Sequence, residues 1–171
     1  MTVDAILNEL IGREGDFTDD PLDRGGATKY GITAATLGNW RGWSRPATRA
    51  EVEALTVPEA KAIYTVRYLE QPGFAQIPSE PLRVALMDDG VNSGPAAAIK
   101  RLQRVLGVSQ DGVLGPITLT AVREYPDTRL LQELVKARCL AYARIVQADP
   151  SQRRFLVGWL TRAFTFLPER A

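Results

Sequence analysis

The acidic stretch REGDFTDDPLDRGGATKYG, residues 13–31, holds the side chains of this chain that are best suited to chemistry. Its acids are Glu14, Asp16, Asp19, Asp20 and Asp23. Two carboxyl groups in unlike surroundings can cleave a glycosidic bond, because one protonates the leaving oxygen while the other activates water or stabilises positive charge. Glu14 follows an apolar helical run, where partial burial of a carboxyl favours the protonated form that can donate. Asp23 lies beside Arg24, a polar setting that favours the ionised form.

Other interpretations of the acidic stretch exist. On composition alone, acids that cap helices or form a solvated loop are the simpler explanation. Acidic loops also bind Ca²⁺, but the spacing does not match an EF-hand loop and no glutamate falls at its end. The run GGATKYG lacks the spacing and the Gly-Lys-Ser/Thr ending of a phosphate loop.

The composition excludes several chemistries. The chain has no histidine, so it lacks the imidazole base of Ser-His-Asp and Cys-His hydrolases and the usual ligands of zinc hydrolases. The single cysteine, Cys139, forms no internal disulfide, and its apolar neighbours favour a buried structural thiol. We therefore expect carboxylates to carry any hydrolysis, with neither cofactor nor metal. Lys plus Arg number 21 and Asp plus Glu number 20, so the chain has no overall positive charge that would attract nucleic acid.

The elements that must position these acids are mainly helices. Val3, Ile6, Leu7, Leu10 and Ile11 recur at helical spacing, so the first helix should end at residues 12–15. Further helices are expected within 32–43, after the capping boxes Thr48-x-x-Glu51 and Thr56-x-x-Glu59, from residues 79, 95 and 116, and over 128–147 and 151–166. The sequence predicts a mainly α fold, a single compact unit of two packed subdomains with a seam near 73–80. A short β-hairpin fits around residues 16–30.

Extended to REGDFTDDPLDRGGATKYGIT, the acidic stretch resembles the signature of glycoside hydrolase family 108, the N-acetylmuramidases of phages and bacteria. That signature runs roughly Glu-Gly-Gly-Tyr, a short acidic spacer, then Asp-Pro-Gly-Gly-x-Thr-x-x-Gly-Ile. The matching positions are Glu14, Asp23, Gly25, Gly26, Thr28, Gly31 and Ile32. The chain departs from the signature where Asp16 replaces the second glycine, Phe17 the tyrosine and Arg24 the proline.

The resemblance implies a lysozyme-like helical fold, with Glu14 as the catalytic acid and Asp23 as the second carboxylate. Asp16, Asp19 and Asp20 remain alternatives to Asp23. Phage lysozymes place eight residues between a glutamate and an aspartate and five before a threonine. This chain has eight between Glu14 and Asp23 and four before Thr28. By this likeness Thr28 would orient the nucleophilic water.

Candidates for substrate binding lie in both halves of the chain. Asp20 and Tyr30 belong to the motif itself, and an aromatic ring such as Tyr30, Trp40 or Trp43 can stack on the apolar face of a pyranose. In the second half, Asn92 stands at a helix end, where its amide could bind a sugar amide or hydroxyl.

The second half resembles the peptidoglycan-binding region paired with this catalytic segment in the same family. The similar pieces are VNSGP, LQRVLG and DGVLGPITLTAV, and FLVGWLTRAF is similar to the family's closing Gly-Trp-x-x-Arg element. The predicted segments are 1–75, catalytic, and 80–168, a helical peptidoglycan-binding region packed against it. Trp159 sits at helical spacing among apolar residues, which favours core packing.

The resemblance predicts a muramidase that hydrolyses the β-1,4 bond between N-acetylmuramic acid and N-acetylglucosamine of peptidoglycan. A lytic transglycosylase and a non-catalytic wall-binding protein are the alternatives. We expect a monomer that binds no nucleic acid and inserts in no membrane. The N-terminus does not read as a signal peptide. We expect the protein to be synthesised in the cytoplasm and released to the wall through a holin or another export factor, as for a bacteriolytic phage endolysin.

Overall fold

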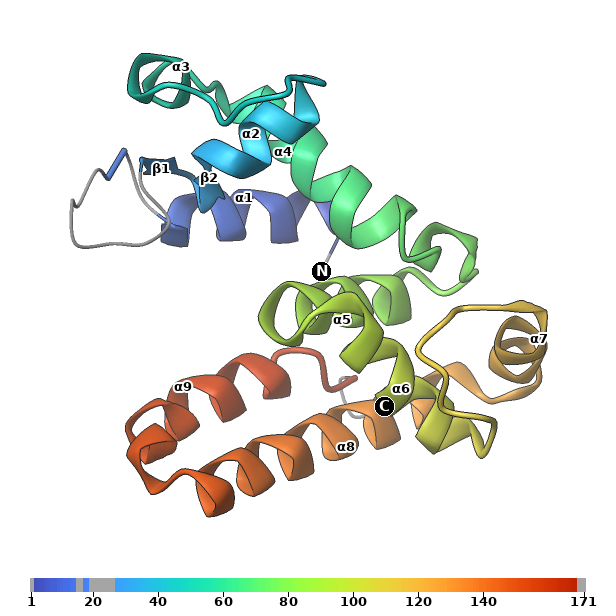
Figure 1. The fold of residues 1–171 in the computed structure, drawn as a ribbon. Helices are drawn as coiled ribbons and strands as arrows, with labels where there is room; N and C mark the ends of the chain where they lie inside the picture. Colours follow the sequence, from blue (N-terminus) through green and yellow to red (C-terminus); the bar gives the residue numbers. More distant parts are fainter. Residues whose placement is uncertain (1, 15–16, 19–26, 169–171) are drawn as a thin grey trace. The chain divides into compact units, whose positions relative to one another are not determined.

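The computed structural model describes residues 2–14, 17–18 and 27–168, without the side chains of Arg13 and Glu14. The chain divides into two compact units, which we call the N-terminal unit (Val3–Arg67) and the C-terminal unit (from Tyr68, together with Met1–Thr2). Helices make up most of both units, as predicted (Figure 1). Over the described ranges, regular β-structure is limited to one two-stranded sheet.

The N-terminal unit is built on two helices that pack against each other, α1 (Val3–Glu14) and α4 (Val57–Thr65). Between them in sequence come β1 (Thr28–Lys29), β2 (Ile32–Thr33), α2 (Ala34–Trp40) and α3 (Arg49–Glu53). The helical spacing predicted for α1 is confirmed at Ile6, Leu7, Leu10 and Ile11, which are buried, whereas Val3, the first of the five predicted positions, is half-buried. Ile32, Leu37, Val52, Leu55 and Ile63 of the same unit are buried as well.

The two predicted capping boxes have different outcomes. At α3 the box is complete: Thr48 Oγ1 accepts from the Glu51 amide and the Glu51 carboxylate accepts from the Thr48 amide. At α4 only half of it forms, since Thr56 Oγ1 accepts from the Glu59 amide. The Glu59 carboxylate instead accepts two bonds of 2.8 Å from the guanidinium of Arg41. A charge-assisted fork is stronger than a neutral amide bond, which explains why the prediction of a second full box is wrong.

The β-hairpin lies at residues 28–33, later than the predicted 16–30. Thr28 pairs with Thr33 and Lys29 with Ile32 in antiparallel register. Tyr30 and Gly31 form the turn with φ of 52° and 70°, the pair of positive φ values that a two-residue type I′ turn requires. Within the predicted range, Thr18 forms an isolated antiparallel bridge with Thr28 through two reciprocal backbone hydrogen bonds of 2.8 Å.

A π-helix, η1 (Val66–Glu70), connects the two units in sequence. In the C-terminal unit, η2 (Phe74–Gln76) precedes α5 (Glu80–Ser93), α6 (Pro95–Leu106) and α7 (Pro116–Glu124). Then come α8 (Asp127–Ala148), η3 (Pro150–Gln152) and α9 (Arg153–Phe164). Helix α5 packs on α6 and α8, and α8 lies beside α9 (Figure 1). Proline opens α6 and α7, and Gly107 ends α6 in a left-handed conformation, as the sequence predicts.

One buried amide organises the turn between α6 and α7. Gln103 is 1% exposed, and its Nε2 donates to Asp111 Oδ1, Val113 O and Thr118 Oγ1. Its Oε1 accepts from the amide of Gly112, which has φ of 80°. Because every polar atom of Gln103 has a partner, the DGV turn is fixed from inside the unit.

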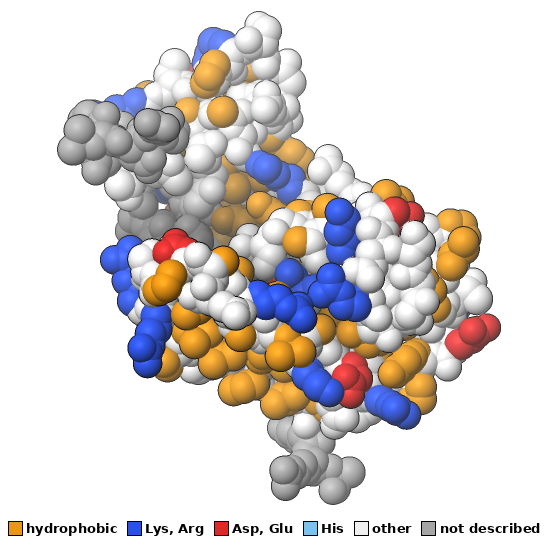
Figure 2. All heavy atoms as spheres, turned by 60° about the horizontal axis from the view of Figure 1, so that its bottom comes forward, with side chains coloured by type: hydrophobic (Ala, Val, Ile, Leu, Met, Phe, Trp, Pro, Cys, Tyr) orange, Lys and Arg blue, Asp and Glu red, His pale blue; other side chains and the backbone are white. Residues whose placement is uncertain are grey.

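The surface of the C-terminal unit mixes apolar and basic side chains over α8 and α9, as Figure 2 shows for one face. The exposed large apolar residues there are Leu140, Ile145, Phe155, Val157, Phe164 and Leu167. Within the described ranges no helix is both long and apolar enough to span a bilayer. Cys139 is half-buried rather than buried as predicted; burial is still the main influence on its thiol and raises its pKa.

Candidate active site

The candidate catalytic region lies where α1 ends. The helix runs to Glu14, and four residues later Thr18 pairs with Thr28 at the start of the hairpin. The pairing consists of two reciprocal backbone bonds between Thr18 and Thr28. The predicted water-orienting Thr28 is thereby fixed, with a half-buried side chain, close in the chain to Glu14.

The acids predicted to act here lie outside the described residues. These are the side chain of Glu14 and the residues Asp16, Asp19, Asp20 and Asp23. Their roles therefore stay predictions.

Tyr30, the predicted sugar-stacking residue, stands at the tip of the hairpin. Its carbonyl accepts a 3.0 Å bond from the Tyr64 hydroxyl of α4, which ties the turn to the helix. The Lys29 ammonium lies 5.2 Å from the centre of the Tyr30 ring and also donates to Glu53 O at 2.6 Å. The ring is half-buried, so one part of it reaches solvent beside a positive charge.

The two tryptophans of the N-terminal unit differ in their surroundings. Trp43 lies under two guanidinium groups, those of Arg41 at 5.2 Å and Arg45 at 4.7 Å from the ring centre. Trp40 is 38% exposed at the end of α2. The cation–π contacts occupy Trp43, which leaves Trp40 as the more accessible aromatic surface.

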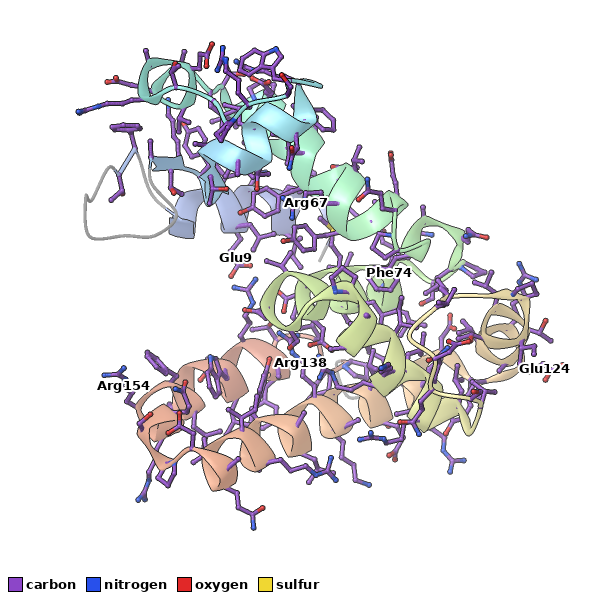
Figure 3. All side chains as sticks on the ribbon, in the orientation of Figure 1. Glu9, Arg67, Phe74, Glu124, Arg138 and Arg154 are labelled. Atoms are coloured by element: carbon purple, nitrogen blue, oxygen red, sulfur yellow. The ribbon has the colours of Figure 1, made fainter. Side chains whose placement is uncertain are left out.

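A second polar cluster, which we call the aspartate–arginine cluster, lies in the core of the C-terminal unit. It consists of Asp88, Asp89, Arg101, Arg138 and Arg162. Asp89 accepts a two-bond fork of 2.7 and 2.6 Å from Arg101, and Asp88 pairs with both Arg138 and Arg162. Both carboxylates are 1% exposed and Arg138 is 3% exposed. Figure 3 labels Arg138 where α8 faces α5 and α6.

The cluster carries a surplus of positive charge, because three guanidinium groups face two carboxylates. Burial opposes the charge on Arg138, but Asp88 and Asp89 outweigh that effect and raise its pKa. The neighbouring Tyr142 accepts a 2.6 Å bond from Arg138 Nε, and burial raises the pKa of its phenol, which stays neutral at pH 7. The phenol therefore does not balance the surplus.

A pocket of about 300 Å³ opens beside this cluster. Its lining residues are Asn92, Ser93, Ala97, Arg101, Tyr142, Ile145 and Trp159. The prediction that Trp159 is a core residue is wrong in part, because its ring is half-buried and lines this pocket. It packs between Tyr142, at 5.3 Å, and Phe155, at 5.9 Å between ring centres. Asn92 also lines this pocket of the C-terminal unit, whereas Thr28 and Tyr30 belong to the N-terminal unit.

No group of three or more Cys, Asp or Glu side chains that could hold a metal ion occurs among the residues with described positions. The adjacent acids Asp88 and Asp89 are already engaged by guanidinium groups.

Comparison with known proteins identifies the family. A family model described as Glycosyl hydrolase 108 matches residues 7–94, just over half of the 171 residues. The chain belongs to the glycosyl hydrolase 108 family. A second family model, described as Predicted Peptidoglycan domain, matches residues 97–164. The matches make the protein a peptidoglycan-active glycosyl hydrolase.

The fold is also similar to that of a solved structure. The chain is 35% identical to the protein in "Structure of Brucella abortus SagA", with a TM-score of 0.70 over 98% of this chain and 96% of that chain. The predicted family and the predicted lysozyme-like helical fold are thus confirmed. Among curated proteins, none matches the chain.

Sequence reasoning missed the aspartate–arginine cluster of this glycosyl hydrolase 108 protein. The signal was present in the sequence, since Asp88 and Asp89 directly follow the apolar run VALM at residues 84–87, and the structure buries all of residues 84–90. Their partners come from α6, α8 and α9, and Arg162 stands 74 residues from Asp88. The closing Gly-Trp-x-x-Arg element now has a structural explanation: Trp159 lines the pocket and Arg162 binds Asp88.

Proposed function

We propose that this peptidoglycan-active glycosyl hydrolase is a muramidase, which cleaves the β-1,4 bond between N-acetylmuramic acid and N-acetylglucosamine. Glu14 is the general acid that protonates the glycosidic oxygen. Asp23 is the second carboxylate, which activates water or stabilises the oxocarbenium-like transition state, and Thr28 orients the water.

The pairing of Thr18 with Thr28 carries this proposal. A general acid and a second carboxylate must be held on rigid elements within reach of one bond. Helix α1 supplies the backbone of Glu14, and Thr18 and Thr28, which lie on either side of Asp23 in the sequence, are paired with each other. The family match over residues 7–94, which contains all three proposed catalytic residues, supports the same assignment.

The proposal is tested by digesting purified sacculi and determining the reducing ends by mass spectrometry. We expect N-acetylmuramic acid at the new ends from the wild-type protein. Glu14→Gln should lower the rate by about 10²–10⁴-fold, the usual contribution of a general acid, and keep the fold. Asp23→Asn should show a comparable loss, whereas Asn at Asp16 or Asp19 should cost little.

Glu53→Gln is the matched control, because Glu53 is an exposed acid at the end of α3 in the same unit. It should hydrolyse sacculi at the wild-type rate. A folded Glu14→Gln protein with substantial activity would remove Glu14 from its role. Products with 1,6-anhydro ends, lighter by one water, would instead identify a lytic transglycosylase.

Peptidoglycan lies outside the cytoplasmic membrane, and we place the action of the enzyme there. Fractionation of producing cells tests this: the protein should be recovered with the wall fraction at the time when peptidoglycan is cleaved. Recovery from the cytoplasm alone during cleavage would contradict it.

A further inference from the structure

The pocket beside the aspartate–arginine cluster has the features of a carboxylate site. The cluster holds one more guanidinium than carboxylate, and its two acids are already engaged. Arg101 lines the pocket and donates hydrogen bonds from Nε and Nη2 to Asp89. Its third nitrogen, Nη1, takes no part in these two bonds. In a partly desolvated setting a surplus guanidinium attracts an anion, and a carboxylate is the anion it binds best by geometry.

Asn92 adds an acceptor to the same pocket. Its Nδ2 donates to Asp88 O at 2.8 Å and to Asp88 Oδ2 at 3.4 Å, two acceptors that fix the orientation of the amide. Oδ1, the other end of the amide, therefore faces away from Asp88, where it can accept a hydrogen bond from an N–H group. Asn92 is exposed and lines the pocket, so a ligand can reach it.

The rest of the lining is largely apolar, since the hydroxyls of Ser93 and Tyr142 are already hydrogen-bonded to Asp89 and Arg138. Ala97, Ile145 and Trp159 line the pocket, whose volume is about 300 Å³. That volume is at the lower end of the range for ligand sites and suits a short group rather than a glycan chain. A ligand that complements this lining carries a carboxylate, and the carbon next to that carboxylate bears both a small apolar group and an N–H.

Peptidoglycan carries that chemistry in the stem peptides, which end in N-acylated alanine: a carboxylate, a methyl group and an amide N–H. We infer that this pocket binds the carboxyl-terminal alanine of a stem peptide, with Arg101 on the carboxylate and Asn92 on the N–H. The inference rests on the proposed action on peptidoglycan. The lactyl group of N-acetylmuramic acid also joins a methyl to a carboxylate, but an ether oxygen stands where Asn92 needs an N–H.

The test is a titration of the full-length protein with diacetyl-Lys-D-Ala-D-Ala, followed by NMR of the Trp159 indole, which Trp159→Phe assigns. We expect saturable shifts of that signal. The same tripeptide with an amidated C-terminus should bind roughly ten- to a hundredfold more weakly, the value of a hydrogen bond to a charged group. N-acetylmuramic acid should bind more weakly than the tripeptide.

Two matched variants localise the binding. Ala97→Glu puts a carboxylate into the pocket and should abolish the shifts, whereas Ala96→Glu, on the neighbouring exposed position of α6, should leave them unchanged. Both add one negative charge to the first turn of the same helix, so their effect on the helix dipole is alike. Stable folding of both is checked by thermal unfolding.

The inference is overturned if the tripeptide does not bind, if its amide binds equally well, if N-acetylmuramic acid binds more tightly, or if the two variants behave alike. Its failure is separable from that of the proposed function. Loss of hydrolysis in Glu14→Gln with no peptide binding removes only the pocket assignment. Retained hydrolysis in Glu14→Gln removes the muramidase assignment whatever the pocket binds.

Discussion

Tyr30 combines a backbone cost with a place at the candidate active site. Among the described residues other than glycine, Tyr30 alone has a positive φ, 52°. A side chain in the left-handed region costs roughly 1 kcal/mol, and such positions persist where the surrounding structure fixes them. Here the Tyr64 hydroxyl holds the Tyr30 carbonyl. A tyrosine kept at a position that suits asparagine or glycine points to a use for its ring.

Tyr30→Asn should therefore separate stability from activity. Asparagine tolerates this turn, so the free energy of unfolding should stay level or rise by up to about 1 kcal/mol. The KM for sacculi should rise severalfold, because the ring that would stack on a sugar is lost. Urea unfolding and hydrolysis rates measure the two effects. Tyr30→Phe keeps the ring and should act like the wild type; a Tyr30→Asn protein with unchanged KM would show that Tyr30 does not contact the substrate.

At the scale of elements, short helices depend on their caps. Helix α3 has only five residues, too few to be stable by itself. Glu51 stabilises its start by accepting a 2.7 Å bond from the Thr48 amide and two bonds, of 2.8 and 2.9 Å, from Arg45. The bonds from Arg45 first, and then that from Thr48, lower the pKa of Glu51 to about 2.

This pKa predicts a pH dependence of stability. A carboxyl with a lower pKa in the folded than in the unfolded state stabilises fully above the unfolded value, about 4.3 for glutamate. The contribution is lost as the pH falls toward 2. Glu51→Gln should thus be less stable than the wild type at pH 7, and the difference should narrow below about pH 4.3.

Urea unfolding of both proteins between pH 7 and pH 2.5 measures this difference. Glu53→Gln, which removes a charge from the exposed end of the same helix, serves as the control for net charge. A gap between Glu51→Gln and the wild type that stays constant over the range would mean that ionisation of Glu51 does not stabilise the helix.

At the scale of the whole molecule, the two units carry different parts of the proposed activity. The candidate catalytic residues belong to the N-terminal unit, and the pocket beside the aspartate–arginine cluster belongs to the C-terminal unit. The family matches divide the chain in a similar way, 7–94 and 97–164, although the first of them extends through α5. Cleavage and retention on the wall should then respond to different substitutions.

Ala97→Glu tests this division with two substrates. On short glycan fragments without peptides its kcat and KM should equal those of the wild type, since the bond cleaved is unchanged. On sacculi the KM should rise, at most by the roughly ten- to hundredfold loss of affinity expected at the pocket. The kcat should stay unchanged. Equal kinetics of Ala97→Glu and wild type on sacculi would show that the pocket takes no part in substrate retention.

The sequence by itself determined the features that depend on neighbouring residues. Apolar spacing located α1, proline and glycine marked the ends of α6 and α7, and Thr48 with Glu51 gave a complete capping box. The motif around Glu14 gave the family, because its residues stand close together in the chain. The bonds behind these features link residues a few positions apart, so the pattern alone specifies them.

Only the tertiary structure decided the features that depend on distant partners. Arg41 diverts Glu59 from its expected cap across 18 residues, and Arg162 reaches Asp88 across 74. Trp159 lines a pocket because α5, α6 and α8 bring Asn92, Arg101 and Tyr142 beside it. Such contacts follow from how whole helices pack. A buried charged side chain pairs with the oppositely charged side chain that the packing places next to it.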